Sequence, residues 1–228
     1  MFTPDEITAI ALSLKVALTA SLASLPFGVA VGWLLARRRF FGKSLFDALL
    51  HLPLVLPPVV VGYALLVWFG HNGMAGRFLA EHFGISVAFR WTGAALASAI
   101  MWFPLMVRSI RLSIEAVDRR LEHAAATLGA GPLRVFFSIT LPLAWPGVVA
   151  GAVLAFAKAL GEFGATITFV SSIPGETRTL SSAMYGLMQA PDGDAGIWRL
   201  AAVAVAISLL ALLASEWLVR RQRGEERD

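Results

Sequence analysis

The chain has 228 residues, of which 57% are apolar and only 15% are charged. A soluble domain needs about a quarter of its residues charged to cover its surface, so the composition excludes a soluble globular domain and a disordered chain. The formal net charge is +4, but the basic residues lie between apolar runs, which is typical of membrane topology rather than of nucleic-acid binding. The absence of cysteine excludes thiolate metal sites and cysteine nucleophiles. The sequence therefore predicts an all-α integral membrane protein that binds lipid and no nucleic acid.

Five apolar stretches approach the roughly twenty residues that a helix needs to cross a bilayer. Tryptophans stand near many of their ends, where amphipathic rings prefer the headgroup layer. We expect a single transmembrane domain over residues 1–228, with its core at about 7–219 and a short charged tail at 220–228. The predicted spans cover about 7–36, 48–70, 91–107, 143–170 and 197–219.

Lysine and arginine are distributed unevenly over the segments between these spans. Thirteen of the nineteen basic residues follow the first span, the third span or the fifth span, and an alternating path places these segments on one side of the membrane. The segments on the other side, 1–6, 71–90 and 171–196, hold only three. Because basic loops stay in the cytoplasm, the sequence predicts an N-terminus outside and a cytoplasmic C-terminus.

Three prolines lie close together in the second predicted span: Pro53, Pro57 and Pro58. A proline leaves backbone carbonyls without their helical partners, and inside a bilayer neighbouring helices or water must satisfy them. Pro57 and Pro58 are therefore candidates for a broken helix that lines a passage. A tolerated kink, packed against its neighbours, is the alternative.

Two pairs of glycines have the spacing that lets helices approach closely. Gly28 and Gly32 lie in the first span, and Gly147 and Gly151 in the fourth. Small residues four apart are common where membrane helices pack. We expect tight packing within the subunit at these positions rather than a specific dimer face.

Five polar residues inside the predicted spans are further candidates for a passage. Lys158 and Glu162 are four apart, so on one helix they would share a face and could pair. Such groups either face a cavity or form a structural ion pair. Lys15 either serves the passage or extends outward to the headgroups. Thr166 and Thr168 could offer hydroxyls to an oxyanion, or bond their own helix backbone.

The chain shows no recognisable catalytic or nucleotide-binding motif. Gly42-Lys43-Ser44 imitates the end of a phosphate-binding loop, but Arg37 stands where that loop needs a glycine. The four histidines lack metal-ligand spacing. We therefore expect no enzyme activity, no metal and no cofactor in this chain, and an energy source that is a partner protein or an ion gradient.

The cytoplasmic segment at about 118–138 is predicted to form two short helices at a glycine corner. Asp118 suits an N-cap, Gly129 a helix stop, and Pro132 the first residue of the next helix. Exposed apolar side chains beside the bend would indicate a docking surface, and a loop packed on its own bundle is the alternative. These side chains are Leu128, Leu133, Val135 and Phe136.

This segment contains Ala124-Ala125 and then Gly129, and after nine intervening residues the chain continues with Ile139, Leu141 and Pro142. This pattern resembles the coupling motif of ABC importer permeases, Glu-Ala-Ala-x-x-x-Gly followed after nine residues by Ile-x-Leu-Pro. The motif's glutamate falls on His123, and Glu122 stands one residue earlier. In that family the loop enters a groove on a cytoplasmic ATPase subunit. The resemblance assigns coupling to Glu122, His123, Ala124, Ala125, Gly129, Ile139, Leu141 and Pro142.

Longer strings at 50–63, 160–170 and 173–180 resemble the permeases of bacterial molybdate importers, and the similarity extends over about 6–218. The resemblance implies the type I ABC importer permease fold in the bacterial inner (plasma) membrane. It also implies a homodimer of permeases, two ATPase subunits that bind ATP and Mg²⁺, and a periplasmic molybdate-binding protein. The transported ion would be molybdate, with tungstate as a further possibility.

Three other functions compete with this interpretation. A permease for another oxyanion, sulfate above all, has the same architecture. An ion-gradient-driven carrier would often contain interrupted helices in both halves, whereas prolines cluster only in the second span. A membrane enzyme would need a nucleophile, a base or a metal cluster.

Overall fold

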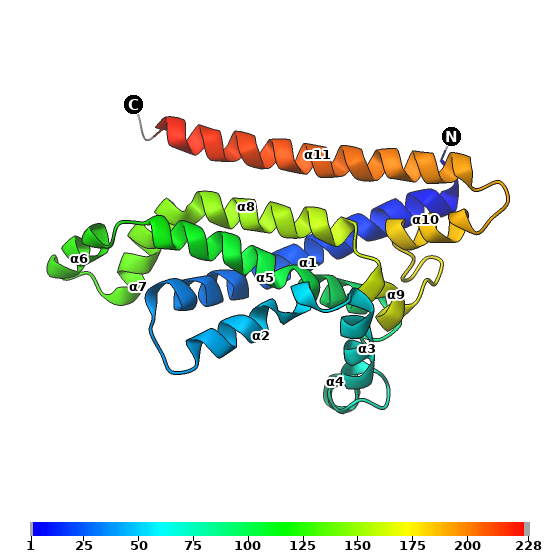
Figure 1. The fold of residues 1–228 in the computed structure, drawn as a ribbon, viewed down its shortest axis with the longest axis horizontal. Helices are drawn as coiled ribbons and strands as arrows, with labels where there is room; N and C mark the ends of the chain where they lie inside the picture. The colour runs from blue at the N-terminus through cyan, green and yellow to red at the C-terminus, as the bar shows by residue number, and fades with distance from the viewer. Residues whose placement is uncertain (1, 226–228) are drawn as a thin grey trace.

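The computed structural model describes residues 2–225, and the surroundings of side chains as far as Trp217. All elements in this part of the chain are helical. Four long helices run along the length of the molecule, with α1, α5 and α8 packed together and α11 against α8 (Figure 1). They are α1 (Pro4–Arg37), α5 (Trp91–Ala116), α8 (Leu141–Leu160) and α11 (Asp194–Glu225).

Shorter helices lie at the two ends of this bundle and along one side. The α6–α7 corner lies at the same end as the C-terminus, and α10 lies at the end of the N-terminus (Figure 1). This places the predicted cytoplasmic loop far from the segments predicted to be outside. The shorter elements are α2 (Lys43–Val55), α3 (Pro58–Phe69), α4 (Met74–Phe83), α6 (Arg119–Thr127), α7 (Pro132–Val135), the π-helical turn η1 (Phe136–Thr140), α9 (Gly164–Val170) and α10 (Leu180–Met188).

The predicted all-α membrane architecture is confirmed. Four helices of the described chain are long and apolar enough to cross a membrane, and the pair α2–α3 makes a fifth span if its halves count together. Helix α5, which contains the third predicted span, continues to Ala116, nine residues beyond the predicted end of that span. The last helix continues to Glu225, so residues 220–225 extend it, and residues 226–228 of the predicted tail lie outside the described residues.

The second span is broken rather than kinked. The two halves α2 and α3 are bent by 109°. Leu56 and Pro57 have extended ψ angles of 145° and 132°, because a residue that precedes a proline is disfavoured in the helical region. Pro53 remains inside α2, so the Pro57-Pro58 pair makes the break.

The fourth span is also broken, although a continuous helix was predicted over 143–170. Helix α8 ends at Leu160, and α9 begins at Gly164. The Glu162 carboxylate accepts a hydrogen bond from the Ala165 N–H (2.9 Å) and thereby satisfies one of the free donors at the start of α9. A side-chain oxygen in this position favours a new helix start over continuation of the old helix.

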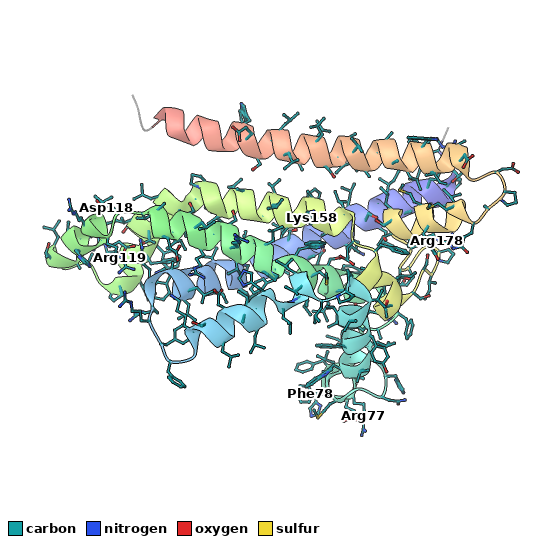
Figure 2. All side chains as sticks on the ribbon, viewed as in Figure 1. Arg77, Phe78, Asp118, Arg119, Lys158 and Arg178 are labelled. Carbon is teal, nitrogen blue, oxygen red and sulfur yellow. The ribbon has the colours of Figure 1, made fainter. Side chains whose placement is uncertain are left out.

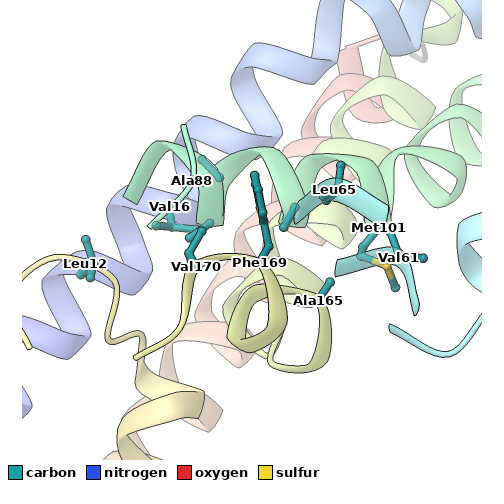
Figure 3. Packing of buried hydrophobic residues seen from close by; sticks show 12 residues of the cluster. Leu12, Val16, Val61, Leu65, Ala88, Met101, Ala165, Phe169 and Val170 are labelled. Carbon is teal, nitrogen blue, oxygen red and sulfur yellow. The ribbon is translucent and has the colours of Figure 1, made fainter. Parts of the chain in front are cut away.

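The core between α1, α3, α5 and α9 is built from small and branched apolar residues. Phe169 and Val170 of α9 are completely buried there, against Val16 of α1 and Leu65 of α3 (Figure 3). Within a membrane, close van der Waals packing of such side chains stabilises the contact between helices. The cluster therefore holds both broken spans against α1 and α5.

The glycine pairs pack within the subunit, as predicted. A Cβ atom at Gly28 would lie 2.9 Å from the Met106 Sδ, and one at Gly32 would lie 2.9 Å from the Ile110 Cγ2. A Cβ at Gly151 would lie 3.0 Å from the Met106 carbonyl oxygen. Helix α5 therefore approaches α1 and α8 more closely than alanine would permit.

Candidate coupling loop and passage

The corner between α6 and α7 forms as the sequence predicts. The Asp118 carboxylate caps α6 by accepting from the Arg120 N–H (2.9 Å). Gly129 adopts a left-handed φ of +88°, and the Ala130 N–H donates to the Ala125 carbonyl (3.0 Å), which is the bonding of a glycine-terminated helix. Pro132 is the first residue of α7. Asp118 and Arg119 lie at one extreme end of the molecule (Figure 2).

Only half of the predicted apolar surface at this corner is exposed. Leu128 and Leu133 are 89% and 75% exposed. Val135, at 9%, is buried, and the Phe136 ring packs edge-on against Trp33 with 6.0 Å between centroids. The prediction of a single exposed apolar surface is therefore wrong for Val135 and Phe136, because the first turn of the helix that follows packs back on α1.

Glu122 is the polar centre of the loop. Its carboxylate forms an ion pair with the Arg37 guanidinium at the end of α1 (3.0 Å) and accepts from the Thr140 hydroxyl before α8 (2.6 Å). Arg37 also donates to the Val117 carbonyl (3.0 Å). Glu122 thus connects α6 to the end of α1 and to the turn η1 that precedes α8.

His123, at the motif's glutamate position, is exposed. It lines a cavity of about 400 Å³ together with Arg38 and Arg119. Glu122 lines the same cavity, where its carboxylate pairs with Arg37.

The last three motif residues lie in one continuous helix that runs over Pro132–Leu160. The helix that contains the start of the fourth predicted span therefore begins eleven residues before residue 143. The π-helical turn η1 contains Ile139, and the Leu141 N–H donates to the carbonyl of Phe136, five residues earlier. Pro142 has no N–H to continue the α-helical pattern, which favours a wider turn just before it.

The predicted Lys158–Glu162 ion pair does not form in the described structure. The two residues would share a helical face only on a continuous helix, and the break after Leu160 separates them. The Lys158 Nζ lies 5.6 Å from the Trp102 ring centroid, while Glu162 is bonded to the Ala165 N–H. The structural ion pair is thus replaced by a cation–π contact and a helix cap.

The other passage candidates fall into two groups. The Lys15 Nζ lies 3.6 Å from the centroid of the Trp91 ring, and Trp91 packs against the core that contains Phe169 of α9. The Thr166 and Thr168 hydroxyls donate to the carbonyls of Phe163 (2.9 Å) and Gly164 (2.8 Å), so both bond their own backbone.

The two breaks meet each other. A Cβ at Gly164 would lie 2.7 Å from the Cβ of Pro58, and one at Gly62 would lie 2.5 Å from the Ala165 carbonyl oxygen. The structure therefore brings the Pro57-Pro58 break and the Glu162 break together, while Lys15 contacts the Trp91 ring.

A charged cluster between α2 and α5 was not predicted from the sequence as a site. The Arg111 guanidinium contacts the carboxylates of Asp47 (3.1 Å) and Glu115 (2.8 Å). The His51 Nδ1 lies 2.8 Å from the Asp47 carbonyl oxygen. The available signal was the i, i+4 spacing of Asp47 and His51 on one helix and of Arg111 and Glu115 on another.

A second unpredicted ion pair joins the first and last helices. The Glu6 carboxylate is buried and lies 2.7 Å from the Arg199 guanidinium. Glu6 also completes a capping box with Thr3 at the start of α1. Because the two partners lie 193 residues apart, no local pattern could have matched them.

The family described as "Binding-protein-dependent transport system inner membrane component" matches residues 28–224 of the chain. The chain belongs to this family. It is a multi-pass inner-membrane component with the fold of an ABC importer permease. In a solved structure of a bacterial alginate ABC transporter, in complex with a periplasmic protein that holds an alginate pentasaccharide, one chain is similar with a TM-score of 0.76 and 16% identity. That similarity covers 96% of this chain and 80% of the other.

Two relatives are similar over nearly the whole chain. "Molybdenum transport system permease protein ModB" of Escherichia coli (strain K12) is 60% identical over 98% of this chain and 97% of its own length. "Sulfate transport system permease protein CysT" of Salmonella typhimurium is 38% identical over 96% of this chain and 78% of its own length. The chain is thus more similar to the molybdenum permease than to the sulfate permease.

Proposed function

We propose that this chain is the membrane-spanning permease subunit of an ATP-driven importer that carries molybdate, and also tungstate, into the bacterial cytoplasm. The observation that carries the proposal is the 60% identity to the molybdenum permease ModB along 98% of the chain. The matched region includes the coupling corner and both broken spans, whereas the sulfate permease is 38% identical. Sulfate is therefore the second candidate substrate.

Three partners belong to the proposed assembly: a second copy of this chain, two cytoplasmic ATPase subunits that bind ATP and Mg²⁺, and a periplasmic binding protein. The exposed corner at Leu128 and Leu133 supports docking of an ATPase subunit. The distribution of basic residues supports a cytoplasmic corner and an outside N-terminus. The chain itself has no catalytic role in this scheme, and the ATPase subunits hydrolyse ATP.

The coupling loop would transmit movement through Glu122. Closure of the ATPase subunits would displace α6, and the Glu122 contacts with Arg37 and Thr140 would pass that displacement to α1 and α8. The two orientations of the permease exchange by alternating access, and nucleotide binding shifts the population between them. Residues Ala124, Ala125, Gly129 and Ile139 shape the corner, and Leu141 and Pro142 begin the helix that moves with it.

The passage would run beside the two breaks rather than through a fixed binding site. Pro57, Pro58, Glu162, Thr166 and Thr168 remain the proposed lining. Because the hydroxyls of both threonines bond their own backbone, contacts to a passing oxyanion would be weak. Selectivity would then reside in the binding protein.

ATP-dependent uptake of molybdate into proteoliposomes tests the proposal. The vesicles would contain this chain, the ATPase encoded next to it and the binding protein, with sulfate as the competitor. Uptake that requires ATP and survives a large excess of sulfate is the expected result. Uptake that sulfate abolishes would reassign the substrate, and uptake independent of ATP would overturn the coupling role.

A further inference from the structure

A polar cavity opens between α2 and α5. It has a volume of about 480 Å³, and five of the eight residues that line it are ionisable. The lining residues are Ser44, Asp47, Ala48, His51, Arg108, Arg111, Leu112 and Glu115.

The cavity lies near the cytoplasmic end of its helices. Arg108 follows Trp91, the first residue of α5, by seventeen positions, which corresponds to about 26 Å of helix. Helix α2 begins at Lys43, in the segment that joins the basic end of α1. At this depth so many charged groups would be costly against lipid tails, so the cavity must face water or another subunit.

Both acids in the cavity pair with Arg111, whereas the second arginine, Arg108, has no acidic partner in the described part of the chain. Arg111 lies between the carboxylates of Asp47 (3.1 Å) and Glu115 (2.8 Å), so both acids already have a cationic partner. Arg108 is exposed and lines the same cavity, and its guanidinium makes no ion pair or hydrogen bond with any other described residue. One guanidinium is therefore available to an outside anion.

We propose that this cavity is the cytoplasmic mouth of the oxyanion passage and that Arg108 is the last cation that the ion contacts before release. A guanidinium offers parallel N–H donors that match two oxygens of a tetrahedral oxyanion. The carboxylates of Asp47 and Glu115 lie in the same cavity and repel a dianion, which keeps binding weak and release fast. The inference rests on the proposed oxyanion transport and assigns to it a site outside the predicted passage residues.

Helix α2 forms one side of this cavity, and the break at Leu56 and Pro57 would let α2 change its angle relative to α3. Helix α2 has no buried residue and packs mainly against α5. The Asp47–Arg111 ion pair joins the two helices directly. Movement of α2 about the break would change the width of the cavity without disturbing the core around Phe169.

Cysteine labelling tests whether the cavity is aqueous, because the chain has no cysteine of its own. Leu112→Cys places a thiol in the cavity, and Leu213→Cys on α11 is the matched control, since the two leucines are 58% and 57% exposed. In the assembled transporter, a charged, membrane-impermeant thiol reagent on the cytoplasmic side should label L112C rapidly and L213C slowly. Equal, slow labelling would show that lipid or protein covers the cavity, and would overturn the proposal.

Substitution of Arg108 tests its contact with the ion. We expect Arg108→Gln to reduce molybdate uptake per ATP hydrolysed by about threefold or more, the scale of one partly exposed charge contact, while Arg108→Lys retains most of it. Arg39→Gln, an exposed arginine on the same side, should leave the ratio unchanged. Uptake by R108Q equal to that of R39Q, or a parallel loss of uptake and ATP hydrolysis, would contradict the assignment. ATP-dependent uptake by the unsubstituted transporter reports on the proposed function separately.

Discussion

The coupling corner and the two broken spans both depend on glycine and proline, but for different physical reasons. At the corner, Gly129 has open space around it and is required for its left-handed φ of +88°. At the breaks, Gly62 and Gly164 lie where another helix leaves no room for a Cβ atom. The corner is thus specified by its own backbone, whereas the contact between the two breaks is specified by close packing of segments distant in the chain.

The largest effect should follow a change in the backbone requirement at the corner. Gly129→Val forces a β-branched residue into the left-handed region, which costs at least about 1–2 kcal/mol and displaces α6 relative to α7. We expect ATP-driven uptake to fall at least tenfold while ATP hydrolysis by the assembled transporter continues. Uptake and hydrolysis in the same proteoliposomes measure this uncoupling.

Gly131→Val is the matched control for that change. Gly131 lies two residues away, also in open space, but has an extended backbone with φ −67° and ψ 162°, which valine readily adopts. It should retain most of the uptake. If both variants lost uptake equally, the corner would be sensitive to side-chain bulk and not to the left-handed φ.

The second effect concerns how the corner is attached to the bundle. Glu122→Ala leaves the partly buried Arg37 guanidinium without its carboxylate and the Thr140 hydroxyl without its acceptor. An unsatisfied buried group costs about 1–3 kcal/mol, so we expect a lower thermal stability in detergent and a loss of uptake of about threefold to tenfold. His123→Ala removes an exposed side chain at the motif's glutamate position, and its effect should be smaller on both measurements. A larger effect of H123A would mean that position 123, and not position 122, carries the coupling contact.

The same contrast explains how far the sequence predicts the structure. Asp118, Gly129 and Pro132 act within a few residues of themselves, so their cap, corner and helix start could be recognised directly. The Pro57-Pro58 break is local as well, since each proline restricts the residue before it. The break at Glu162 was missed, because Gly161 alone is tolerated in a helix and the cap at Ala165 is visible only in three dimensions.

Contacts between distant residues account for the remaining errors. Asp47 and Arg111 lie 64 residues apart, so the cavity between α2 and α5 could not be assembled from either helix alone. Partial burial of Phe136 depends on Trp33 of α1, which lies about a hundred residues earlier in the sequence. Hydrophobicity indicated that these side chains would avoid water, but not which surface would cover them.

A smaller effect is expected where the two broken spans touch. Gly62→Ala places a Cβ atom 2.5 Å from the Ala165 carbonyl oxygen, and α3 must move away from α9. Overpacking of this kind costs about 1–3 kcal/mol, so the midpoint of thermal unfolding in detergent should fall. Gly186→Ala on α10 is the control, because nothing lies within 4 Å of its added Cβ, and this change should not lower the midpoint.

The smallest expected effect is an interaction energy close to zero between Lys158 and Glu162. Measured unfolding free energies of Lys158→Met, Glu162→Gln and the double variant form a thermodynamic cycle. Glu162 caps α9 and Lys158 lies over Trp102, so without a direct ion pair the interaction energy should stay below about 1 kcal/mol. Interaction above about 1 kcal/mol would indicate a direct ion pair, and therefore a helix that continues through Gly161 in the membrane. The cycle thus tests whether the break between α8 and α9 persists in the membrane. The break between α2 and α3 must persist, because its prolines prevent a continuous helix.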